Sequence, residues 1–208
     1  MARASGRRSV VLSLLALLAA APALAAAKPP APLPDDMSMG SPRAKVTLIE
    51  YASVACPHCA RFNNDVFPAI KKRYIDTGKV RYTLREYLTD PVQLAAAGFM
   101  LARCTGAKHY FKTVDAVFHG QAEIYSTGKI LPTLNRIGAA SGLSEAQVKA
   151  CITDQAAADA LEARVQGYAD KDGIDSTPTF LIGDKKLVGE QTLADIEAAL
   201  DAALKQKG

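Results

Sequence analysis

The feature that most constrains this chain is the motif Cys56-Pro57-His58-Cys59, which stands between a strand pattern and a helix pattern. The segment before it, 45–51 (KVTLIEY), is rich in β-branched and apolar residues, as strands are. The segment after it, ARFNNDVFPAIKKRY, predicts a helix. Two cysteines at i and i+3 of a helix start can close a disulfide across one turn, and the helix N-terminus favours a thiolate on the first. The motif therefore predicts a redox-active dithiol.

The order of residues in the motif assigns their roles. Cys56 is expected to be the accessible sulfur that attacks or is attacked, and Cys59 the buried resolving partner. Pro57 suits the first helical position because its missing N–H is not needed there. His58 is expected to be the main side-chain cause of a lowered pKa of Cys56, which we expect well below neutral pH.

Two metal-centred alternatives fit the sequence less well. A haem attachment site needs His directly after the second cysteine, where Ala60 stands. A zinc site needs two more ligands at suitable spacing, and Cys104 and Cys151 stand apart with only His109 near either. We therefore expect no metal and no cofactor.

The periodicity of the remaining chain predicts an α/β fold with a central sheet flanked by helices. Alternating apolar residues over 79–88 indicate a second strand, which completes a βαβ unit. Helical spacing replaces strand patterns from 91 to about 173, where Ser144 and Gln147 form a capping box. Strand patterns return at 179–182 and 185–188, joined by a Gly-Asp turn. A final helix has Thr192 as its expected N-cap.

The first residues carry the pattern of a secretory signal peptide. Arg3, Arg7 and Arg8 precede a leucine-rich apolar run, and small residues in Ala-x-Ala order place the cleavage site after Ala25 or Ala27. The alternative is an uncleaved membrane anchor, since the run is nearly long enough to span a bilayer. The segment 28–34 (KPPAPLP) reads as an extended linker. These patterns predict an exported, periplasmic protein in a compartment where disulfides persist.

Charge gives no support for nucleic-acid binding. The 208-residue chain has 25 basic and 21 acidic residues. Removing the three arginines of the signal segment leaves 25 − 3 = 22 basic residues, which nearly balance the acidic ones. The length favours one domain, or one domain with an insertion.

The chain has, in order, a strand, the CPHC motif with its helix, a helical block, and a TPTF segment (177–180) with a following hairpin. In this arrangement it resembles the DsbA-like family of thiol oxidases over about 44–205. The resemblance implies a thioredoxin fold with a helical insertion. It also implies a cis peptide bond at Thr177-Pro178 that faces the dithiol, leaving the Thr177 backbone free to pair with an extended substrate. The expected divisions are a signal peptide (1–25), a Pro-rich linker (26–43), the first half of the fold with CPHC (44–88), the insertion (89–173), and the second half with the cis-proline loop (174–208).

Glu50 is a further candidate, because alternation puts it on the strand face of Val46 and Leu48. The resemblance implies that it manages the proton of the buried thiol. The alternative is an exposed carboxylate paired with a basic residue, and Arg85 on the neighbouring strand is a possible partner.

Cys104 and Cys151 lie on apolar stripes of two predicted helices, so both thiols should point inward. We predict a structural disulfide between them, and the alternative is a pair of buried free thiols. His109 and His119 are expected to be packing or surface residues.

Together these features predict a monomeric, exported thiol:disulfide oxidoreductase that donates a Cys56–Cys59 disulfide to reduced substrate proteins. The resemblance implies reoxidation by a quinone-linked, DsbB-like membrane partner. The alternatives are a disulfide isomerase or reductase of the same fold, and a non-enzymatic protein that binds metal such as copper, or acts as a chaperone.

Overall fold

A five-stranded mixed sheet lies at the centre of the molecule, in the order β1-β3-β2-β4-β5. The computed structural model describes Met1 and residues 33–207; the predicted signal peptide after Met1 and residues 26–32 of the predicted linker lie outside the described residues. Strands β2 (Val46–Ala52) and β3 (Val80–Glu86) are parallel, and β1 (Met37–Met39), β4 (Thr179–Ile182) and β5 (Lys185–Val188) are antiparallel to their neighbours. This is the predicted thioredoxin fold.

The linker predicted over 26–43 is corrected by β1. Met37 pairs with Leu84 on the edge of the sheet, and Asp36 forms an ion pair with buried Arg85. Residues 36–39 therefore belong to the folded unit, because the backbone of 37–39 pairs with β3 and the carboxylate of Asp36 binds Arg85 of β3.

The parallel pair β2 and β3 is joined by one continuous helical run. It comprises α1 (Pro57–Arg61), η1 (Phe62–Val66), α2 (Phe67–Ile70) and η2 (Lys71–Ile75), in which η1 and η2 are π-helical turns. The sequence predicted a regular helix here. Pro68 interrupts the hydrogen-bond ladder because it has no N–H, and widened turns accommodate such a break.

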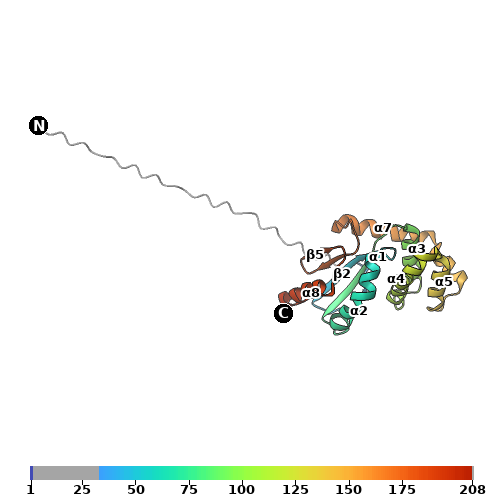
Figure 1. Ribbon diagram of the computed structural model, residues 1–208, viewed down its shortest axis with the longest axis horizontal. Coiled ribbons are helices and arrows are strands. Elements are labelled where there is room, and N and C mark those ends of the chain that lie inside the picture. The colour runs from blue at the N-terminus through green and yellow to red at the C-terminus, as the bar shows by residue number, and fades with distance from the viewer. Residues whose placement is uncertain (2–32, 208) are drawn as a thin grey trace.

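The helical insertion occupies one end of the molecule, and β5 and α8 lie at the other (Figure 1). Its helices are α3 (Val92–Cys104), α4 (Tyr110–Thr127), α5 (Ile130–Ala139), α6 (Glu145–Ile152) and α7 (Gln155–Asp172). The predicted capping box of Ser144 and Gln147 begins α6. Helix α3 approaches the end of β2 closely at Gly98, where an added Cβ would come 2.6 Å from Val54 Cγ2.

Alternating residues of β2 face two layers. Leu48 joins the large core that includes Phe62, Phe180 and Leu200 of the closing helix α8 (Leu193–Lys207). Ile49 and Tyr51 face the opposite side and pack with residues at the end of α7. Within the described residues, no helix is both long and apolar enough to cross a bilayer.

Candidate active site

The dithiol lies where β2 ends and α1 begins. Cys56 is the N-cap of α1 in an extended conformation (φ −83°, ψ 120°), and Pro57 is the first residue of the helix. The Cys59 backbone N–H points at Cys56 Sγ, with 3.5 Å between nitrogen and sulfur. Both cysteines are free thiols in this structure. Cys56 is 7% exposed and Cys59 is fully buried, so the first sulfur is the more accessible one.

The pKa values of the two thiols are shifted in opposite directions. The pKa of Cys56 is lowered from 9.0 to about 5, chiefly by a hydrogen bond with the Cys59 thiol. Burial opposes this shift, while Thr177 and the backbone N–H groups of Cys59 and His58 add to it. Burial raises the pKa of Cys59, and the neighbouring Cys56 raises it further. The site therefore favours a thiolate on Cys56 and a neutral thiol on Cys59.

His58 is not the main side-chain cause of the lowered Cys56 pKa, so that prediction is wrong. Its ring turns to Glu190 in the loop after β5, with 2.7 Å between Nδ1 and Oε2. Arg61 contacts both carboxylate oxygens of Glu190, at 2.8 and 2.7 Å. Hydrogen bonds from Arg61 and His58 lower the pKa of Glu190 to about 2. The sequence analysis missed Arg61 and Glu190, and only the position of Arg61 one turn after His58 could have indicated a contact.

The loop before β4 completes the wall around Cys56. The peptide bond Thr177-Pro178 is cis, and the carbonyl oxygen of Thr177 lies 3.5 Å from Cys56 Sγ. The carbonyl of Pro178 accepts a hydrogen bond from Gly189 N–H after β5. A second cis bond, Asp90-Pro91, was not predicted.

Glu50 lies beneath the dithiol and is 3% exposed, on the strand face that alternation indicated. Its partner is Tyr82 of β3, whose hydroxyl donates to Oε2 at 2.6 Å. Burial raises the pKa of Glu50 to about 8. The suggested pairing with Arg85 is wrong, because the Arg85 guanidinium binds Asp36 and Asp172 on the other side of the sheet.

A family model described as Thioredoxin matches residues 33–202. The crystal structure of alpha-DsbA1 from Wolbachia pipientis is 33% identical, superposes with a TM-score of 0.77, and covers 85% of this chain and 94% of its own. The chain belongs to the DsbA-like thiol:disulfide oxidoreductases of the thioredoxin family.

Two sequence relatives of this DsbA-like chain agree with the assignment. A Rickettsia conorii protein named as a protein-disulfide oxidoreductase is 31% identical over 174 residues, which are 83% of this chain and 62% of the relative. The chain thus spans about three fifths of that relative's length. The thiol:disulfide interchange protein DsbL of Escherichia coli O6:H1 is 26% identical over 174 residues, covering 77% of this chain and 78% of its own.

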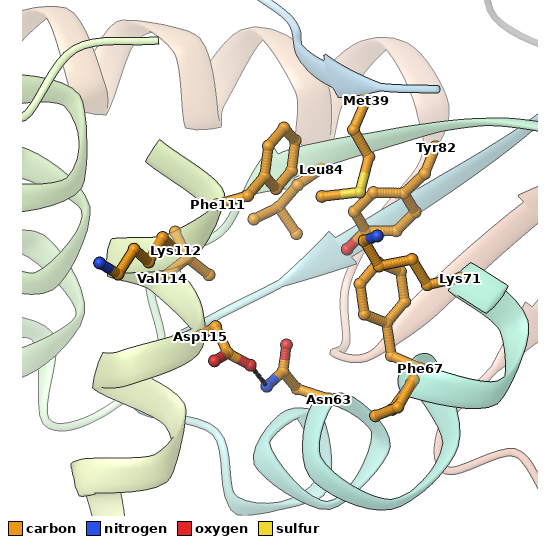
Figure 2. A pocket seen from close by; sticks show the side chains of 11 residues that line it. Met39, Asn63, Phe67, Lys71, Tyr82, Leu84, Phe111, Lys112, Val114 and Asp115 are labelled. Atoms are coloured by element: carbon orange, nitrogen blue, oxygen red, sulfur yellow. Dashed lines mark hydrogen bonds between the residues drawn. The ribbon is translucent and has the colours of Figure 1, made fainter. Parts of the chain in front are cut away.

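A pocket of about 360 Å³ adjoins the buried part of this DsbA-like site (Figure 2). Aromatic rings of Phe67, Tyr82 and Phe111 line it, and Lys71 and Asp115 stand among its polar residues. Tyr82 belongs both to this pocket and to the hydrogen bond with Glu50.

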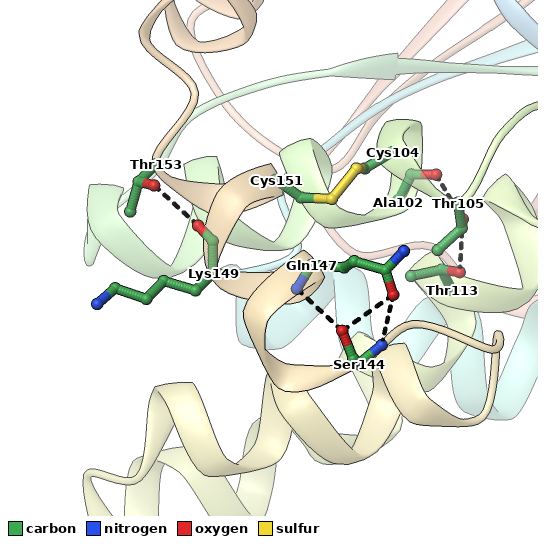
Figure 3. The surroundings of a disulfide bond; sticks show 9 residues. All are labelled: Ala102, Cys104, Thr105, Thr113, Ser144, Gln147, Lys149, Cys151 and Thr153. Atoms are coloured by element: carbon green, nitrogen blue, oxygen red, sulfur yellow. Dashed lines mark hydrogen bonds between the residues drawn. A yellow bond between two sulfur atoms is a disulfide. The ribbon is translucent and has the colours of Figure 1, made fainter.

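A disulfide joins Cys104 at the end of α3 to Cys151 of α6, with 5.9 Å between their Cα atoms (Figure 3). It lies in the insertion of the DsbA-like fold, apart from the dithiol. No cluster of three or more His, Cys, Asp or Glu side chains suited to a metal ion occurs among the described residues.

Proposed function

We propose that the chain is an exported thiol oxidase that donates a Cys56–Cys59 disulfide to reduced substrate proteins. The observation that carries the proposal is the unequal pair, a stabilised Cys56 thiolate beside a buried Cys59 thiol. Stabilising the thiolate stabilises the reduced form, so the disulfide becomes a stronger oxidant. A pKa two units below pH 7 corresponds to about 60 mV in a two-electron couple.

The reaction begins from the oxidised protein. A substrate thiolate attacks Cys56 Sγ, the Cys56–Cys59 bond breaks, and Cys59 leaves as a thiolate that takes up one proton. A second substrate thiolate then attacks the substrate sulfur of the mixed disulfide, and Cys56 leaves as a thiolate. The substrate loses two electrons to form its disulfide, and the protein gains them as two reduced cysteines.

Glu50 is proposed to supply the proton that the buried Cys59 sulfur needs. It is protonated at neutral pH because its pKa is about 8. Once it has given up the proton, its negative charge raises the pKa of Cys59, which keeps the proton on the sulfur. A neutral carboxyl beside a leaving thiolate can donate without first drawing a proton from water.

Thr177 and Pro178 are proposed to present backbone to the substrate. The Thr177 carbonyl stands beside the reactive sulfur, where an extended peptide can pair with it. His58 and Pro57 are proposed to shape the same face of α1.

The partners are proposed to be reduced proteins and a quinone-linked, DsbB-like membrane protein that reoxidises the dithiol. The N-terminal sequence pattern supports export to the periplasm by a cleaved signal peptide, with the mature protein acting as a monomer.

Oxidation of a reduced, unfolded ribonuclease by stoichiometric oxidised protein tests the proposal. We expect recovery of ribonuclease activity, and none with Cys56→Ala. A redox equilibrium with glutathione separates an oxidase from a reductase, since a pair as reducing as thioredoxin (about −270 mV) contradicts the proposal.

A further inference from the structure

The turn that carries Cys56 is tied to the helical insertion through three successive carbonyl groups. Gln121 Nε2 of α4 donates to the carbonyl of Val54 at 2.8 Å and to that of Cys56 at 3.2 Å. The hydroxyl of Tyr125, one turn later on α4, donates to the carbonyl of Ala55. Two side chains of one helix face thus hold the backbone on which the reactive sulfur stands.

Burial makes these donors necessary. Val54 and Ala55 are fully buried, and Gln121 is 4% exposed. A buried carbonyl that loses its donor cannot turn to water unless the backbone moves. Helix α4 packs beside α1 (Figure 1), so its donors reach the turn directly.

We propose that Gln121 and Tyr125 are positioning residues that determine how strongly the N-terminus of α1 stabilises the Cys56 thiolate. Their hydrogen bonds hold the carbonyl groups of Val54 and Ala55 toward α4, while the Cys56 carbonyl accepts both from Gln121 and from the Ala60 N–H of α1. The peptide planes are then fixed so that Cys56 keeps its N-cap conformation, with Sγ 3.5 Å from the Cys59 nitrogen. Without the two donors, the turn can rotate its carbonyls toward solvent and carry the sulfur off the N–H groups.

The proposal deepens the proposed function, on which its consequence for substrate oxidation rests. It gives the insertion a chemical role, because α4 acts on the dithiol through the backbone carbonyls of residues 54–56. Tyr125 is 44% exposed, and the charge of Cys56 contributes, after burial, to its raised pKa. Its ring therefore lies at the rim of the site as well as above the turn.

The test uses the full reduced chain with Gln121→Met or Tyr125→Phe, which remove the donors and keep most of the side-chain volume. The thiolate absorbance of Cys56 is followed against pH, and the equilibrium constant with glutathione is measured. We expect the pKa of Cys56 to rise by about one unit in each variant. The matching tenfold change in the equilibrium constant is about 30 mV toward a more reducing pair.

Tyr87→Phe and Gln166→Met make the same chemical changes away from the turn, and should leave both readouts unchanged. If Gln121→Met does not fold, Tyr125→Phe decides. A folded Tyr125→Phe protein that is less heat-stable but has an unchanged Cys56 titration overturns the proposal, since the bond would then be only structural. If the parent protein oxidises no substrate while the titrations shift, the proposed function fails and the positioning role stands.

Discussion

Cys56 and Cys59 share one helical turn, yet their surroundings separate them chemically. Sγ of Cys56 meets the N–H groups that a helix start leaves unpaired, whereas the sulfur of Cys59 lies in the core. The asymmetry therefore comes from backbone geometry and burial, with the Cys59 thiol as the main side-chain partner of Cys56.

Replacing Cys59 should disturb the titration of Cys56 more than replacing His58. In Cys59→Ala the largest stabilising hydrogen bond is lost and the backbone N–H groups remain. We expect the pKa of Cys56 to rise from about 5 by one unit or more. His58→Leu should produce a smaller shift, because its ring faces Glu190. Thiolate absorbance against pH measures both, and a larger shift in His58→Leu would contradict this account.

Glu50→Gln should stabilise the oxidised protein, and increasingly so as pH rises. With both cysteines reduced, the folded pKa of Glu50 is about 8, above its ordinary value of 4.5, chiefly because of burial, which the oxidised protein keeps. Between these values the unfolded chain releases a proton that the folded chain keeps, so wild-type stability falls with rising pH, by up to about 1.4 kcal/mol per pH unit. The amide still accepts from Tyr82 but does not titrate.

Urea unfolding of both oxidised proteins between pH 4.5 and 8 measures the difference. The exposed change Glu145→Gln is the control. A stability difference that is the same at every pH would show that Glu50 is ionised in the folded protein.

The sequence could predict those site residues whose roles follow from local order. Cys56, Pro57 and Cys59 stand at fixed places in one turn, and strand alternation placed Glu50 inward. Tyr82 and Glu190 could not be found this way, because their contacts depend on the register of β3 and on the path of the loop after β5.

At the scale of elements, the long periodic segments were predictable and the short ones were not. The hairpin of β4 and β5 has the predicted bounds, since a Gly-Asp turn separates two strand patterns. Strand β1 has only three residues, too few to show alternation, and exists because β3 offers it an edge. The π-helical turns on either side of Pro68 were not predicted, because apolar spacing shows a helical segment but not where its hydrogen-bond pattern widens.

The disulfide between α3 and α6 should stabilise the insertion without affecting the dithiol. Its cysteines are 47 residues apart, and closing such a loop contributes about 4 kcal/mol in the chain-entropy model. Cys104→Ala with Cys151→Ala should therefore lower the free energy of unfolding by up to that amount. Denaturant unfolding measures the loss, and the Cys56 titration should be unchanged. Alkylation of both thiols in the untreated, native protein would show that no bond is formed.

At the scale of the whole molecule, charges buried at the end of β3 connect the sheet to its surroundings. Arg85 is fully buried and contacts Asp36, before β1, and Asp172, at the end of α7. Glu86, the next residue, is equally buried and contacts Arg103 of α3 and Arg164 of α7. One strand end thus holds the N-terminal segment and two insertion helices, which fixes the insertion on the sheet.

Arg85→Met should be among the most destabilising changes in the chain. The side chains of Asp36 and Asp172 are 4% and 7% exposed, so removing the guanidinium leaves two carboxylates buried without that cation. Breaking a buried ion pair from one side costs about 3–5 kcal/mol. Adding Asp36→Asn and Asp172→Asn to the variant removes the stranded charges and should recover part of the loss. Denaturant unfolding of the single and triple variants measures this recovery. A triple variant less stable than Arg85→Met would show that the aspartates stabilise the fold through other contacts, and that the buried charge is not what makes the single change costly.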